Sequence, residues 1–200
     1  MPMSDLLIET ICIRNGKVQN IAAHNQRCHR ARSAVFGRGR KINLRSHIEV
    51  DKAIWPVTKC RITYGHQVID VTYEPYLMKE ITSLQLVDIG DYTYDHKYHD
   101  RSELDDFYSQ RKDADDILMV RDGLITDSYY ANVALSNNGT WYTPEYPLLR
   151  GTMRAKLLLK GKLKVKNIAT TELHTYDKVR LFNAMIPFGK IEFGRDMIQE

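Results

Sequence analysis

The sequence predicts an α+β protein built from antiparallel hairpins and a few helices. Three observations support this. Asn-Gly or Asp-Gly pairs at 15–16, 122–123 and 138–139 separate β-branched apolar runs, which is the strongest short signal for a hairpin. Residues 24–36 instead repeat apolar residues at helical spacing. The chain has 200 residues and is 43% hydrophobic, which is enough for one large domain or two small ones.

The first half reads as an antiparallel α+β layer. In chain order it predicts strands over 6–13 and 18–21, a helix over 24–36, a loop over 37–41, a second helix over 45–54 and strands over 59–65 and 68–74. In the first helix Cys28, Ala31 and Val35 fall three and four residues apart, and Gly37 ends it. Pro56 closes the second helix.

The second half is richer in strands. It predicts strands over 83–89, 116–120, 123–127, 132–136, 140–144 and 178–186, with helices over 101–111 and 151–161. The stretch PYLMKEI, 75–81, reads as a crossover, so we expect an N-terminal lobe over 1–78 and a C-terminal lobe over 79–200.

The net charge of +4 hides separate blocks of charge. Residues 10–48 hold nine Lys/Arg and 148–171 hold seven, with no acid in either, while 100–127 hold nine Asp/Glu. Such blocks suit a nucleic-acid-binding domain or a site for a small polyanion. No basic–aromatic interleaving typical of a nucleic-acid motif is present, so we expect a small anionic ligand and no nucleic acid.

Other patterns narrow the class of protein. No run of 18 apolar residues is present and MPMSDLLIETICI has no signal-peptide pattern, so we expect no membrane segment. Cys12, Cys28 and Cys60 are odd in number and scattered, which favours buried thiols in a cytoplasmic protein. No His or Cys spacing predicts a metal site.

Four motifs occur in a fixed order. Lys97 lies in DYTYDHKYHDR, and LITDSYYANVAL places Asp127 five residues before Asn132. WYTP, 141–144, and RGTMR, 150–154, follow. This set, with the opening ETICIRNGKVQNIAAHNQR, resembles the class IV aminotransferase family, the fold-type IV enzymes that use pyridoxal 5'-phosphate. The resemblance spans residues 6–190 and implies a two-lobed fold: a small N-terminal α/β lobe and a β-rich pseudo-barrel lobe.

The resemblance implies a role for each matching residue. Lys97 would form a Schiff base with the cofactor and act as the catalytic base. Asp127 would hold the pyridine nitrogen protonated, although the family usually has Glu there. Asn132 would fix the loop around this acid. The resemblance also implies a set of residues that bind the cofactor phosphate: Arg27, Gly151, Thr152, Met153, Ala184 and Met185.

Each role has a plainer alternative. Lys97 could be a solvated loop charge, and Asp127 a turn residue that bonds to its own backbone. Arg27 could be a solvated helix arginine, Gly151–Thr152 an ordinary helix cap and Asn132 a strand-start residue.

Within the family, KYHDR, 97–101, looks most like aminodeoxychorismate lyase, which releases pyruvate and 4-aminobenzoate for folate synthesis. Arg61 and Arg101 would bind the substrate carboxylates, and the family implies a homodimer. Transamination of branched-chain or D-amino acids is the alternative reaction. A basic nucleic-acid-binding domain and a family member that has lost its cofactor are alternatives of other classes.

Overall fold

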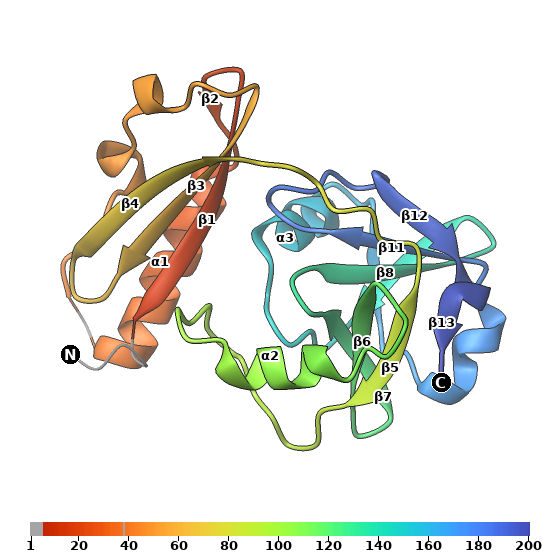
Figure 1. Cartoon of the computed structure of the whole chain (residues 1–200). Helices are drawn as coiled ribbons and strands as arrows, with labels where there is room; N and C mark the ends of the chain where they lie inside the picture. Colours follow the sequence, from red (N-terminus) through yellow and green to blue (C-terminus); the bar gives the residue numbers. More distant parts are fainter. Residues whose placement is uncertain (1–5, 38) are drawn as a thin grey trace. The chain divides into compact units, whose positions relative to one another are not determined.

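The computed structural model describes residues 6–37 and 39–200. Residues 1–5, which begin the stretch read for a signal peptide, and residue 38 of the expected loop over 37–41 lie outside the described residues. The chain divides into two units (Figure 1). The first comprises residues 1–78 and 96–100, and the second comprises 79–95 and 101–200. The segment 96–100, expected in the C-terminal lobe, therefore packs with the first unit.

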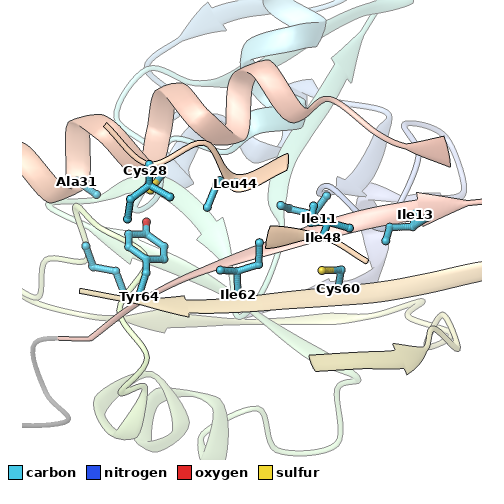
Figure 2. Close-up of a cluster of buried hydrophobic side chains, with 11 residues drawn as sticks. Ile11, Ile13, Cys28, Ala31, Leu44, Ile48, Cys60, Ile62 and Tyr64 are labelled. Carbon is cyan, nitrogen blue, oxygen red and sulfur yellow. The ribbon is translucent and has the colours of Figure 1, made fainter. Parts of the chain in front are cut away.

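The first unit is a four-stranded antiparallel sheet in the order β2-β1-β3-β4 with one long helix. Its elements are β1 (Leu7–Arg14), β2 (Lys17–Val18), α1 (Ile21–Phe36), two 3₁₀ turns (Leu44–His47 and Val50–Lys52), β3 (Val57–Tyr64) and β4 (Val68–Pro75). Its core lies between α1, the 3₁₀ turns and the sheet. Figure 2 shows Cys28 of the helix and Tyr64 of β3 pointing toward one another there.

The second unit contains a larger mixed sheet with two short helices. Its elements are β5 (Leu84–Asp88), α2 (Ser102–Ser109), β6 (Asp116–Arg121), β7 (Leu124–Ser128), β8 (Asn132–Asn137), β9 (Thr140–Pro144), α3 (Thr152–Leu159), β10 (Lys164–Lys166), β11 (Lys178–Phe182), β12 (Ile191–Gly194), β13 (Ile198–Gln199) and the 3₁₀ turns Thr170–Thr175 and Arg195–Met197. The strand order is β10-β9-β8-β7-β6-β5-β13, and β11 pairs with β8 and β12.

Strand β8 is the junction of this sheet. It pairs with β9 and β11, and it meets β7 where Asn132 lies opposite Asp127. Helix α3 packs on β8 and β11 through a small apolar core of Ala134, Leu157, Leu163 and Phe182. The sheet thus brings the end of β7 and the start of β8 close to the chain that enters α3.

The three expected hairpin turns are confirmed. In each, two consecutive residues have positive φ: 47° and 70° at Asn15–Gly16, 52° and 73° at Asp122–Gly123, and 49° and 77° at Asn138–Gly139. This is the backbone of a type I′ turn, which Asn, Asp and Gly adopt most readily. The turns connect β1 to β2, β6 to β7 and β8 to β9.

Three expected elements differ from the structure. The helix expected over 45–54 is wrong: two 3₁₀ turns occupy this region, separated by extended backbone at Ile48 and Glu49. Helix α1 begins at Ile21 rather than residue 24, which shortens β2 to two residues. The strand expected over 178–186 ends at Phe182, because the side chain of Asn183 accepts hydrogen bonds from the N–H groups of Met185 and Ile186 and closes a turn.

Candidate active site

Asp127 is a buried carboxylate at the end of β7. Its side chain accepts hydrogen bonds at Oδ1 from Asn132 Nδ2 (2.7 Å) and at Oδ2 from Leu149 N (2.8 Å). The donors are the side chain of Asn132 and the backbone of Leu149, and neither is the adjacent backbone to which the turn-residue alternative would bond. Burial raises the pKa of Asp127 to about 7, against the lowering effect of these hydrogen bonds and of the charge of Arg154.

Asn132 connects this acid to the start of α3. Its Nδ2 also donates to the carbonyl of Leu149 (2.9 Å). A Cβ atom on Gly151 would lie 1.9 Å from the Oδ1 atom of Asn132. Only glycine therefore leaves room for this amide, and its backbone is ordinary, with φ −67° and ψ 146°. Asn132 thus packs against the turn at residue 151, which is more than a strand-start residue would do.

The turn at 151 leads directly into α3, whose N-cap residue, Gly151, makes no side-chain cap hydrogen bond. The first N–H groups of a helix lack intrahelical acceptors and carry partial positive charge, which favours an anion. Arg154 is buried and donates from Nη2 to the carbonyl of Pro144 (2.7 Å), so it ties the helix start to the end of β9. The WYTP and RGTMR motifs are therefore in contact. Met153 packs its side chain against the small core beneath α3.

The turn after β11 holds Ala184 and Met185. The N–H of Met185 already donates to Asn183 Oδ1 (2.8 Å), and Asn183 Nδ2 donates to the carbonyl of Tyr130 (3.1 Å). Asn183 therefore links this turn to the β7–β8 turn. The backbone N–H groups of Ala184 and Met185 were both expected to bind phosphate. The N–H of Met185 instead has an acceptor within the protein, Asn183, which the sequence did not indicate.

Lys97 belongs to the first unit and lies along β1. Its carbonyl accepts a hydrogen bond from the N–H of Ile8 (2.8 Å), and the N–H of His99 donates to the carbonyl of Leu6 (2.7 Å). Tyr98 forms a β-bridge with Leu7. The backbone at Lys97 is thus held like a short extra strand, and the lysine is half-buried.

Arg27 projects from α1 onto β1. Its Nε and Nη2 donate to the two carboxylate oxygens of Glu9 at 2.7 and 2.6 Å, and its side chain is only 12% exposed. It is therefore not the solvated helix arginine of the alternative reading. His24 Nδ1 lies 2.5 Å from Glu9 Oε2. Glu9 and His24 were not among the expected site residues. Glu9 does alternate with the apolar residues Leu7 and Ile11 in the sequence, which places it on the core-facing side of the strand.

The two arginines expected at the substrate carboxylates belong to different units. Arg61 is half-buried on β3, opposite Thr10 and Thr72. Arg101 precedes α2, donates from Nη2 to the carbonyl of Tyr129 (2.7 Å) and lies 4.3 Å above the ring of Tyr129. Arg101 thus supports the β7–β8 turn that follows Asp127.

Residues 66–192 match the family Amino-transferase class IV. The chain belongs to this family. The family's enzymes use pyridoxal 5'-phosphate, so the protein is an enzyme of the lyase or aminotransferase type. An uncharacterized protein from Haemophilus influenzae is 35% identical over 90% of this chain and 97% of its own length.

Solved structures of the family have the same fold. A candidate 4-amino-4-deoxychorismate lyase from Haemophilus somnus is 31% identical, with a TM-score of 0.85 over 90% of this chain and 96% of that one. A hypothetical aminotransferase from Mycobacterium tuberculosis, in a PLP-bound form, is 19% identical, with a TM-score of 0.78 over 98% of this chain and 84% of that one. The expected two-lobed fold-type IV architecture is thereby confirmed. Among the described residues, no helix has the length and apolar character to cross a bilayer.

The raised pKa of Asp127 predicts a pH dependence of stability in the cofactor-free protein. Because the folded-state pKa, about 7, lies above the value in the unfolded chain, the folded state binds the proton more tightly. The contribution of this group to the free energy of unfolding is therefore fully present below about pH 4 and is lost as pH rises through about 7, by about 1.4 kcal/mol for each unit of pKa difference. Urea unfolding at pH 5 and pH 8 should show a smaller pH effect in Asp127→Asn than in the wild type.

The pH effect on stability must be compared between Asp127→Asn and the wild type because a second buried acid, Asp116, also contributes to it. Burial raises its pKa to about 6, so it contributes a loss in the same direction. An unchanged pH effect in Asp127→Asn would contradict the assignment to Asp127.

Proposed function

We propose that the protein is a pyridoxal-phosphate-dependent lyase that converts 4-amino-4-deoxychorismate to 4-aminobenzoate and pyruvate. The observation that carries the cofactor assignment is the cluster of Asp127, Asn132 and Gly151. It sets a buried acid with a pKa near neutrality beside a helix N-terminus whose N-cap residue is glycine, within one unit. A buried carboxylate suits a protonated pyridine nitrogen, and a helix N-terminus suits a phosphate monoester.

The remaining donors suit the same cofactor. Lys97 supplies a primary amine on a backbone fixed to β1, and Arg27 supplies a guanidinium whose orientation is fixed by Glu9. In this proposal the N–H groups of Thr152 and Met153, the Thr152 hydroxyl, Arg27 and the backbone near Ala184 bind phosphate. When bound, the cofactor would act as the electron sink of the reaction.

The residues of the chain then have separate tasks. Lys97, as a neutral amine, removes the proton from the amine-bearing carbon of the substrate and returns a proton to the departing enolpyruvyl group. Asp127 keeps a proton on the ring nitrogen, and Asn132 and the Leu149 N–H hold its carboxylate in place. Breaking the carbon–oxygen bond to the enolpyruvyl group makes the substrate ring aromatic, which drives the step. Arg61 and Arg101 are proposed to bind the two substrate carboxylates.

The choice of lyase over transaminase has two supports. The segment KYHDR, with Arg101 four residues after Lys97, looks most like the lyase branch. The relative from Haemophilus somnus, which aligns over nearly its whole length, also has the name of a candidate lyase of this type. We further propose that the protein acts as a homodimer in the cytoplasm, in line with the family resemblance. Its mass in size-exclusion chromatography with light scattering would test the dimer.

The reaction can be tested with purified protein and 4-amino-4-deoxychorismate. We expect stoichiometric pyruvate and 4-aminobenzoate with no keto acid added, because elimination needs no amino acceptor. Pyruvate would be measured by coupling to lactate dehydrogenase, and 4-aminobenzoate by its fluorescence.

Two outcomes would contradict the lyase assignment. One is turnover that requires 2-oxoglutarate together with a branched-chain or D-amino donor, which would identify a transaminase. The other is protein that stays colourless with added pyridoxal phosphate and binds random DNA in a salt-sensitive manner, which would favour a nucleic-acid-binding domain.

A further inference from the structure

Glu9 interrupts the apolar face of β1. Leu7, Ile11 and Ile13 are fully buried in the core of the first unit, and Glu9, at the intervening position of the same face, is also 0% exposed. Figure 2 shows Ile11 and Ile13 between the sheet and α1. An acid on the core-facing side of a strand contradicts the local pattern, and such conflicts are concentrated at functional sites.

The Glu9 side chain is ionised in the folded protein. Complete burial is the largest influence and raises its pKa, but the charge of Arg27 and the hydrogen bond and charge of His24 outweigh it and lower the pKa to about 2. The carboxylate holds Arg27 through two parallel hydrogen bonds, Nε to Oε1 and Nη2 to Oε2. This bidentate contact fixes both the plane and the direction of the guanidinium.

Stability alone does not explain this pair. A buried ion pair is, on average, no more stabilising than well-packed apolar residues, and leucine and isoleucine occupy the neighbouring positions of the same face, Leu7 and Ile11. A guanidinium that is already oriented, however, loses less conformational entropy when it binds an anion. The Arg27 side chain keeps 12% of its surface exposed.

We propose that Glu9 is a positioning residue that orients Arg27 toward the phosphate group of the cofactor. The inference rests on the proposed cofactor and not on the choice of reaction. The direction in which phosphate affinity changes when Glu9 is removed distinguishes an effect of orientation from an effect of charge. By charge alone, a carboxylate beside Arg27 weakens the binding of a dianion, so removal of Glu9 would strengthen it. If Glu9 acts by orientation, its removal weakens phosphate binding instead.

The test compares two ligands on the cofactor-free full-length protein. Pyridoxal 5'-phosphate and pyridoxal, which lacks the phosphate, are titrated by visible absorbance, and the ratio of their Kd values measures the contribution of phosphate. We expect Glu9→Gln to lower the preference for the phosphate form by about tenfold, the scale of one charge-assisted hydrogen bond, with pyridoxal affinity nearly unchanged. Arg27→Met should lower the preference at least as much, and the double variant no further.

Glu74→Gln is the matched control, because Glu74 makes an exposed ion pair with Lys59 on the same sheet. It should keep the wild-type preference. An unchanged or increased preference in Glu9→Gln would overturn the inference, as would equal losses for both ligands, which indicate a structural role.

A second variant covers the case in which Glu9→Gln does not fold. Glu9→Asp keeps the charge but is about one methylene shorter, so it cannot make the same two-pronged contact. It should also lose phosphate preference, and a wild-type preference in folded Glu9→Asp would overturn the inference. Wild-type protein with no preference for phosphate would instead count against the proposed cofactor, so the two failures are distinguishable.

Discussion

Replacing Lys97 by alanine is expected to remove the visible absorbance of the cofactor-loaded protein and to lower kcat by about 10³-fold or more. The variant loses both the covalent attachment of the cofactor and the amine that transfers protons. General acid–base catalysis alone contributes about 10²–10⁴-fold. Its backbone contacts to Ile8 do not depend on the side chain, so the fold should persist. The readouts are the absorption spectrum with pyridoxal phosphate and the rate of pyruvate release.

Lys162→Ala is the control for this experiment, because Lys162 is exposed and its backbone N–H bonds to Leu157. It should keep both colour and rate. Lys97→Arg adds a sharper comparison, since it keeps the positive charge but cannot attach to an aldehyde in the same way. A Lys97→Ala protein that, after borohydride reduction and dialysis, still carries the cofactor on a stable secondary amine, detected by the mass of the protein, would refute the assignment, because another lysine would then hold the cofactor.

The second large effect is expected from Gly151→Ala. The added methyl would lie 1.9 Å from Asn132 Oδ1, so the amide or the helix start must move. Elsewhere Gly→Ala at an ordinary φ stabilises slightly, by about 0.4–1 kcal/mol. Here we expect a loss of about 1–3 kcal/mol, the usual cost of an overpacked site, together with weaker binding of pyridoxal phosphate. Urea unfolding and cofactor titration measure the two effects.

Gly39→Ala is the matched control, because the nearest atom to its added Cβ, Arg32 Nη2, is at an ordinary 3.8 Å. The double variant Gly151→Ala, Asn132→Ala tests the cause. If the clash is with Asn132, the double variant should be more stable than the sum of the two single changes predicts. Strict additivity would show that the methyl collides with something other than this amide.

The fold was predictable where its signals are local. An Asn-Gly or Asp-Gly pair adopts positive φ in its own turn whatever surrounds it, so all three hairpins could be placed from the sequence. Strands β10, β12 and β13 have two to four residues and no alternation long enough to detect. The region 45–54 has helix-forming residues, but Asn43 caps only a short 3₁₀ turn there through a hydrogen bond from the N–H of Arg45.

The candidate site was predictable to a different extent. The family resemblance pointed to Asp127, Asn132 and Gly151. In the structure Asn132 donates a hydrogen bond to Asp127, and Gly151 leaves room for the side-chain amide of Asn132. The donor from Leu149 to Asp127 crosses 22 residues and leaves no trace in any short motif. Glu9 was missed because a single acid in a strand pattern is easily taken for an exposed residue, although its alternation with Leu7 and Ile11 placed it inside.

The position of Lys97 limits how this protein can be recombined. The chain leaves the first unit after residue 78, returns for residues 96–100 and leaves again, so no single cut divides the molecule into its two units. A chimera with a crossover at 78 would pair the β1 of one parent with the Lys97 segment of another, across the contacts at Ile8 and Leu6. Shuffling between relatives should therefore transfer residues 96–100 together with the N-terminal sheet, as a two-part insert.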